Sequence, residues 1–433
     1  MNYPDQQTSV NGQSAEIVLH SAPWVVPISV PVLADGSVAV KMGEIVDIGA
    51  RETLLKKYPG AKEIRYQSVL MPGLVNAHIH LELSHLKTPE NHSAYHDFTD
   101  WISALIKKRE EGNVVRSEIV AAFSRTLQDQ HSLGVVAVCD IGNIYYEELD
   151  NDRLPDDWPL IYRMIEYLGP TRSAEDVVKK TIIGLENNIV VTAHAPYSTT
   201  PNLISFIKNR CNQLGHIFSI HVAESYGEIE LIQKGSGIFR DFLEMRGSWD
   251  GSLDMEKEQF NGAIEYLSSI GGVDQSTLLV HCVHLTESEI ELVKKKGAHV
   301  CICPGSNKFL GVGLPAVDSM VEVGILPALG TDSHASNEHI DLWQEMKIIS
   351  ENFPALKPDT VLAMATFAGA RALNCSGKFG SLDVGRSAKF IHVESPGLLN
   401  CEESQEVVRE LASGGRPQTI SWLSTSADCF NEL

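Results

Sequence analysis

The sequence predicts an α/β protein: a (β/α)8 TIM-type barrel with a small β-sandwich domain built from both chain ends. Eight short and nearly continuous apolar runs follow one another between residues 69 and 333, which is typical of parallel strands buried on both faces. Helical stretches separate these runs, and strand-like segments stand before and after them. We expect the barrel to span residues 69–377, with residues 1–68 and 378–433 together forming the sandwich.

The first 68 residues contain short apolar runs joined by turn signals. Asp-Gly within Ala34–Ser37 and Met-Gly within Lys41–Gly43 are dipeptides typical of hairpins, so we expect a turn at each. The tail contains further strand-like segments at Gly380–Gly385 and Phe390–Val393. The two ends of the chain therefore contribute β-structure on either side of the barrel.

The eight runs of the barrel are separated by helices with clear start and stop signals. Thr200 is an expected N-cap with Pro201 at the first helical position and Gly215 beyond the end. Thr286–Glu289 is a capping box, and its helix should stop at Gly297. We expect a helical insertion at residues 226–262. The runs are 69–80, 135–143, 160–169, 189–198, 217–225, 277–285, 299–307 and 326–333.

Composition excludes several classes of function. The chain of 433 residues has 35 Lys+Arg and 56 Asp+Glu, a net charge of −21, which argues against a nucleic-acid partner. The apolar stretch Ile17–Leu33 contains three prolines and cannot span a membrane. Residues 1–14 lack a secretory signal pattern, and the eight cysteines form no CxxC, so we expect a cytoplasmic protein with free thiols. A homodimer is the default expectation for its assembly.

Histidine and aspartate stand at the same end of four runs. Alternation along a strand points His78 and His80 to one face. His221, His281 and Asp332 stand at the ends of the fifth, sixth and eighth runs. Three neutral imidazoles and one carboxylate suit Zn²⁺, or Fe²⁺, with room left for water. The pattern therefore predicts one divalent metal ion at the mouth of the barrel.

One known class of zinc enzyme carries HxE followed by PCxxC. His80-Leu81-Glu82 matches the first half of that signature, but no PCxxC occurs anywhere in the chain. This class is excluded.

Ordered motifs along the chain resemble the deaminase and chlorohydrolase branch of the amidohydrolase superfamily. They are Met71–His80, His221–Glu224, Leu279–Leu285, Cys303–Asn307 and Leu329–Ser333. More narrowly, the chain resembles the aminodeoxyfutalosine deaminases of the alternative menaquinone pathway, through residues 80–86, 98–102, 193–198 and 235–240. Lys389 departs from the family pattern, which usually has an acidic residue there.

The resemblance implies a metal-dependent deaminase that releases ammonia from an adenine-bearing nucleoside. Aminodeoxyfutalosine is the first expected substrate, with adenosine, 5′-methylthioadenosine and S-adenosylhomocysteine as alternatives. Glu224 would handle the proton on the substrate ring, while His281 and Asp332 would take the proton of the attacking water. The implied metal ligands are His78, His80, His221 and Asp332.

The resemblance also bears on the number of metals: members of the superfamily with two metals have a carboxylated lysine in the fourth strand, and the fourth run here contains no lysine, which favours a single ion. Its His194 is either a substrate contact or a structural residue. Trp101, at the end of the long loop 81–101, either stacks on a base or packs the first helix, and Ser306 either forms a turn or binds substrate. With Glu82, these residues are the expected substrate contacts.

Two other functions stay open at this point. The first is a hydrolase of the same fold that displaces chloride or amine from a triazine-like ring. The second is a metal-bound scaffold without catalysis, which predicts gaps in the ligand set, and the sequence shows none.

Overall fold

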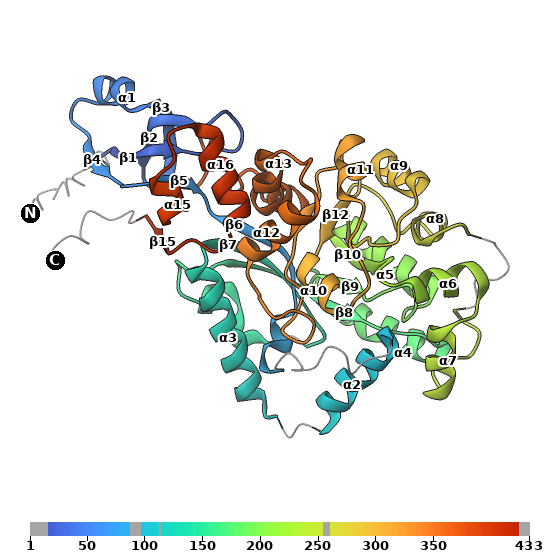
Figure 1. Cartoon of the computed structure of the whole chain (residues 1–433). Coiled ribbons are helices and arrows are strands. Elements are labelled where there is room, and N and C mark those ends of the chain that lie inside the picture. The colour runs from blue at the N-terminus through green and yellow to red at the C-terminus, as the bar shows by residue number, and fades with distance from the viewer. Residues whose placement is uncertain (1–15, 87–96, 112–113, 145, 254–259, 424–433) are drawn as a thin grey trace, which may run out of the picture.

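The computed structural model of the chain describes residues 16–86, 97–111, 114–144, 146–253 and 260–423. Within these residues the strands form three sheets, one with seven strands and two with four parallel strands each (Figure 1). The α/β class predicted from the sequence is confirmed. Among the described helices, none combines the length and apolar character needed to cross a membrane.

Eight parallel strands make up the two smaller sheets, and helices lie on their outer side (Figure 1). Backbone hydrogen bonds join the sheets at both edges: the His221 amide donates to the His194 carbonyl at 2.9 Å, and the Asp332 amide to the His78 carbonyl at 3.1 Å. The carboxyl ends of the strands therefore meet around one site. The strands are β6 (Leu74–Ile79), β7 (Val135–Gly142), β8 (Leu160–Tyr167), β9 (Val191–Ala193), β10 (Phe218–Val222), β11 (Thr277–His281), β12 (His299–Ile302) and β13 (Ala328–Leu329).

The helices begin and end where the sequence signals place them. Thr200 caps α5 (Pro201–Leu214), which ends at Gly215 in the left-handed conformation. Thr286 and Glu289 form the predicted capping box of α9 (Glu287–Lys296), which ends at Gly297. The expected insertion contains α6 (Tyr226–Lys234) and α7 (Ile238–Met245). The other α-helices of this part are α2 (Phe98–Glu111), α3 (Arg116–Ser132), α4 (Arg172–Ile183), α8 (Ala263–Ser269), α10 (Pro304–Phe309), α11 (Val317–Glu322), α12 (Leu342–Asn352), α13 (Pro358–Ala363) and α14 (Gly369–Ala372), with a π-helical turn at Met364–Ala368 and 3₁₀ turns at Leu81–His85, Glu147–Leu149 and Asn151–Arg153.

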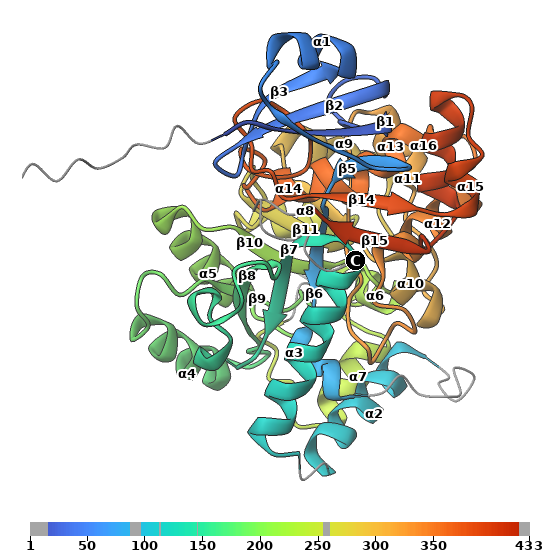
Figure 2. The same cartoon turned by 90° about the vertical axis from the view of Figure 1, so that its left-hand side faces the viewer.

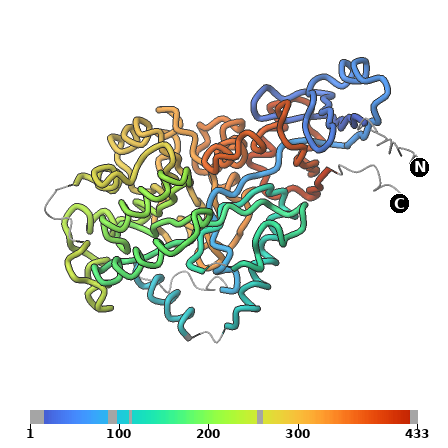
Figure 3. The backbone as a smooth tube through the Cα atoms, turned by 180° about the vertical axis from the view of Figure 1, so that it is seen from behind, coloured from blue at the N-terminus to red at the C-terminus, as the bar shows by residue number. Residues whose placement is uncertain are grey.

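Strands from both ends of the chain share the seven-stranded sheet. The blue and red segments lie together at one end of the molecule (Figures 2 and 3). The strand order is β15-β14-β5-β1-β2-β3, with β4 beside β1. These strands are β1 (Val18–Val25), β2 (Leu33–Lys41), β3 (Glu44–Ala50), β4 (Lys62–Arg65), β5 (Val69–Pro72), β14 (Phe390–Glu394) and β15 (Thr419–Trp422), and the nearby helices are α1 (Arg51–Lys57), α15 (Pro396–Leu399) and α16 (Ser404–Ser413).

One of the two predicted hairpin turns is correct and the other is wrong. Met42 and Gly43 join β2 to β3 with φ of 53° and 76°, the positive pair that a type I′ turn requires. Ala34–Ser37 instead lies inside β2, paired with β1. Asp35 has a φ of 43°, which departs from extended backbone within the strand. A Cβ on Gly36 would lie 2.8 Å from a Val25 side-chain atom, so the absence of a side chain there lets β1 and β2 pack closely.

Two further predictions about strands are corrected by the structure. The first apolar run is two strands, since β5 pairs in the terminal sheet and β6 pairs with β7. The two strands meet at Gly73, where the backbone approaches β7 so closely that a Cβ would lie 2.9 Å from the Cβ of Val136. Gly380–Gly385 forms no strand, and both glycines have positive φ, 92° and 86°. All seven described cysteines are free, as expected, and Cys429 lies outside the described residues.

Candidate active site

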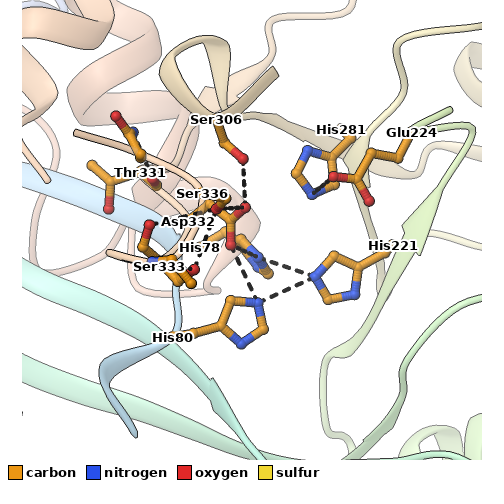
Figure 4. Close-up of polar contacts among 12 residues, drawn as sticks. His78, His80, His221, Glu224, His281, Ser306, Thr331, Asp332, Ser333 and Ser336 are labelled. Atoms are coloured by element: carbon orange, nitrogen blue, oxygen red, sulfur yellow. Dashed lines mark hydrogen bonds and ion pairs between the residues drawn. The ribbon is translucent and has the colours of Figure 1, made fainter. Parts of the chain in front are cut away.

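Three imidazoles and one carboxylate converge at the carboxyl ends of the parallel strands (Figure 4). His78 lies in β6 and His80 follows it, His221 lies in β10, and Asp332 follows β13. The Nε2 atom of His221 is 3.2 Å from that of His78 and 3.3 Å from that of His80. Asp332 Oδ1 is 3.5 Å from His80 Nε2 and 3.8 Å from His78 Nε2. Side chains from distant parts of the sequence thus form one compact donor set.

The four donor atoms lie close enough to ligate one divalent cation. Bonds of about 2.0–2.2 Å place neighbouring ligand atoms roughly 3–3.6 Å apart, and a cation that expands to five ligands would also accept a water. Burial lowers the pKa of His80 and of His221 to about 4 and that of His78 well below its ordinary value, so the three rings are neutral. Neutral imidazoles and a carboxylate are the donors that Zn²⁺ and Fe²⁺ accept.

Neighbouring groups orient these candidate ligands. His221 Nδ1 lies 3.0 Å from the His194 carbonyl, to which it donates, and its Nε2 lone pair therefore faces the other rings. Asp332 Oδ2 accepts hydrogen bonds from the hydroxyls of Ser306 at 2.6 Å and Ser336 at 2.7 Å, which leaves Oδ1 facing the imidazoles. Although burial opposes ionisation of Asp332, the nearby histidines and both hydroxyls hold its pKa below the usual range.

A second pair of side chains lies beside the donor set. Glu224 Oε1 is 3.4 Å from His281 Nε2, and both side chains are buried. His281 Nδ1 donates to Asn307 Oδ1 at 2.9 Å, so Nε2 carries a lone pair directed toward Glu224. Burial raises the pKa of Glu224 well above its ordinary value, so this carboxyl keeps its proton to higher pH than an exposed glutamate does. Glu224, His281 and Asp332 lie close enough to pass a proton among them.

The backbone at these strand ends is held in an uncommon conformation. Ala223, His281, Cys282 and Asp332 have φ of 53°, 72°, 53° and 57°, and they account for half of the non-glycine residues with positive φ in the described chain. Each such residue costs about 1–3 kcal/mol. The surrounding fold compensates for this strain, and the sharp turns direct the functional side chains toward one another.

The four expected substrate contacts lie in different surroundings. The His194 ring is 5.0 Å from that of His221, and its Nδ1 is 2.6 Å from Ser198 Oγ. Trp101 donates from Nε1 to the Ala335 carbonyl at 3.1 Å. Ser306 donates to Asp332, as described above.

Glu82 accepts hydrogen bonds from protein groups on both of its carboxylate oxygens. Its partners are the Arg109 guanidinium at 3.1 Å and the Asn143 amide at 2.8 Å. The four contacts stay predictions, and residues 87–96 of the long loop 81–101 lie outside the described residues.

Several buried residues around the site were missed from the sequence. Glu166 Oε1 lies 3.3 Å from His221 Nδ1, and burial raises the pKa of Glu166 to about 8. Glu166 stands near the end of the third apolar run, so the same strand-end rule could have found it. Ser336 lies in the loop between β13 and α12, and Glu228 lies in α6 after β10. No sequence signal points to either residue.

Comparisons with known proteins agree with this geometry. The sequence pattern of the amidohydrolase family matches residues 69–420. The 5-methylthioadenosine/S-adenosylhomocysteine deaminase of Halalkalibacterium halodurans is 28% identical, over 79% of this chain and 76% of that protein. The aminodeoxyfutalosine deaminase of Nitratiruptor sp. is also 28% identical, over 83% and 88%.

A solved structure has the same fold. It is an adenosine deaminase from Xanthomonas campestris with bound zinc, with a TM-score of 0.70 and 23% identity, over 94% of this chain and 91% of that one. Since the family pattern covers most of the chain, this protein belongs to the amidohydrolase family.

Proposed function

We propose that this protein is a hydrolytic deaminase that removes the amine of an adenine-bearing nucleoside as ammonia. The observation that supports it best is the buried Glu224 carboxyl, which lies 3.4 Å from His281 Nε2, next to the candidate ligands but outside them. Relatives named as deaminases of adenine nucleosides support the same reaction. We further propose that His78, His80, His221 and Asp332 hold one Zn²⁺, a set that Fe²⁺ also accepts.

In the proposed reaction, three side chains besides the candidate metal ligands' imidazoles handle protons: Glu224, His281 and Asp332. A divalent cation held by these residues would lower the pKa of a bound water and so supply a nucleophile near neutral pH. Addition of the water oxygen to the amine-bearing carbon would place negative charge on the neighbouring ring nitrogen, to which Glu224 donates its proton. One proton of the water would pass to Asp332 or His281, and from there to the amine, which leaves as ammonia. The other, on the new hydroxyl oxygen, would return to Glu224 as the carbonyl forms.

One metal per chain follows from the ligand set. The strand β9 consists of Val191, Thr192 and Ala193, so it offers no lysine to bridge a second ion. The groups of potential ligands among the described residues all gather around this one site.

For the substrate we propose aminodeoxyfutalosine, with His194, Trp101, Glu82 and Ser306 around it. The position of His194 beside His221 supports the first of these contacts. The side-chain oxygens of Glu82 and Ser306 already form hydrogen bonds with protein groups. A substrate that contacts them would therefore share each oxygen with its present protein partner.

We propose the full architecture on similar grounds. Backbone bonds at both edges of the two parallel sheets support a closed (β/α)8 barrel within residues 69–377, with β6 as its first strand. A sandwich domain from residues 1–68 and 378–433, joined by β5, is supported by apolar residues buried on both faces of the terminal sheet: Leu19 and Ala39 pack near α1, and Val38, Val40 and Phe390 pack in a second cluster.

The test is an ammonia-release assay on the zinc-loaded protein with aminodeoxyfutalosine, 5′-methylthioadenosine, S-adenosylhomocysteine and adenosine. We expect turnover of at least one nucleoside, with the highest kcat/KM for aminodeoxyfutalosine. A chlorinated triazine serves as the comparison, with chloride release measured beside ammonia. Chloride release without nucleoside deamination would replace this proposal by the chlorohydrolase alternative.

A further inference from the structure

A buried glutamate ties down the turn that carries Glu224. The carboxylate of Glu228 accepts hydrogen bonds from the backbone amides of Ala223 at 3.0 Å and Glu224 at 3.2 Å, one on each oxygen. Glu228 is fully buried, with 0% exposure. It is absent from the donor set described above, and the proposed chemistry does not use it.

This arrangement differs from an ordinary helix cap. Glu228 is the third residue of α6, whose N-cap Ser225 makes no side-chain cap hydrogen bond. In a capping box the third residue reaches back to the amide of the N-cap itself. Here the carboxylate reaches one and two residues further, to Glu224 and Ala223. Its hydrogen bonds are therefore made with the turn between β10 and α6.

The same turn is held from its other side by the strand end that carries His281. The amide of Cys282 donates to the Val222 carbonyl at 3.0 Å, and the amide of His284 donates to the Ala223 carbonyl at 2.9 Å. Ala223 has a φ of 53°, a conformation that a non-glycine residue keeps only when its surroundings hold it. Contacts on both sides thus fix where the Glu224 carboxyl lies relative to His281 Nε2.

We propose that Glu228 is a positioning residue for the proton donor Glu224, an inference that rests on the proposed function. It holds the amides of Ala223 and Glu224 so that the Glu224 carboxyl stays beside His281. Because the proton is needed only as the reaction proceeds, loss of this positioning lowers kcat more than it changes KM.

The chain offers a matched control in Glu289. It is the third residue of α9, is 3% exposed, and accepts hydrogen bonds from the amides of Ile264 at 2.8 Å and Thr286 at 3.0 Å. Its hydrogen bonds with these backbone amides tie α9 to the start of α8 and to its own N-cap Thr286, rather than to the 221–228 segment. In E228Q and in E289Q the amide nitrogen cannot accept a hydrogen bond, so each variant loses one buried acceptor.

The experiment compares wild type, E228Q and E289Q as zinc-loaded full chains. It measures kcat and KM on the best nucleoside, zinc per chain, Tm, and hydrogen exchange of the 221–228 segment. We expect E228Q to lose about 10–100-fold in kcat per bound zinc with little change in KM, since small misplacements of reacting groups have effects of this size. We expect E289Q to lower Tm similarly but keep kcat, and only E228Q to speed exchange in the 221–228 segment.

Three results would overturn the assignment of Glu228: an unchanged kcat in E228Q, an equal kcat loss in E289Q, or a loss fully explained by missing zinc. Absence of nucleoside turnover in wild type would instead refute the proposed function. Hydrogen exchange separates the two failures, because it reports on the turn without any substrate. Unchanged exchange in E228Q would overturn the positioning role in either case.

Discussion

Replacing Glu224 by Gln tests the proton donor without disturbing the metal. The amide has nearly the shape of the buried carboxyl, and Glu224 is not among the four proposed ligands, so we expect packing and zinc content to be retained. What disappears is the acidic proton. General acid catalysis contributes about 10²–10⁴-fold in rate, which corresponds to about 3–5 kcal/mol of transition-state stabilisation. We therefore expect kcat to fall by that factor while KM stays close to the wild-type value.

The assay is ammonia release under substrate saturation, with zinc determined on the same samples. In wild type the raised pKa of Glu224 keeps its proton to higher pH than an ordinary glutamate, so activity that depends on this proton falls as pH rises through that pKa. In Glu224→Gln this alkaline fall should disappear from the residual activity. A variant that keeps wild-type kcat and full zinc would remove Glu224 from the mechanism.

Three other variants test the remaining parts of the account. Asp332→Ala should lose both zinc and turnover, since it removes one of the proposed ligands, and retained zinc would contradict the ligand set. Asn307→Leu removes the acceptor that orients the His281 ring, and it should lower kcat by about 10-fold or more with zinc retained, whereas unchanged kcat would exclude this orienting role. The Asp274 carboxylate pairs with buried Lys208. Burial of Asp274 opposes its ionisation, but Lys208 and nearby hydrogen-bond donors outweigh this effect and lower the pKa of Asp274 from 3.8 to about 2. Asp274→Asn should therefore be less stable than wild type above pH 3.8, and the difference in Tm should shrink as pH falls toward 2; a difference independent of pH would refute this.

Much of the site was predictable because parallel strands bring their carboxyl ends together. His78, His80, His221, His281 and Asp332 stand at the ends of apolar runs, and that simple rule groups them, whereas the choice of four ligands among them rests on the family resemblance. Helix boundaries such as Thr200 to Gly215 were predictable for a similar reason, since cap residues act on their own local backbone.

The features that sequence reasoning missed depend on how the backbone folds at a strand or turn, even where the partners lie only four residues apart. Ala34–Ser37 has a hairpin composition, yet pairing with β1 continues through it. Ser336 reaches Asp332 only because the loop after β13 folds back, and Glu228 acts on a turn that its own helix follows. Their roles come from tertiary geometry, which no residue spacing records.

Crystals of the zinc-loaded protein, measured with anomalous scattering at the zinc edge, test the central claim most directly. We predict a single anomalous peak about 2.0–2.2 Å from Nε2 of each of His78, His80 and His221 and from Asp332 Oδ1. A peak that excludes Asp332, a second peak of equal strength in the same site, or no peak among these four side chains would contradict the account.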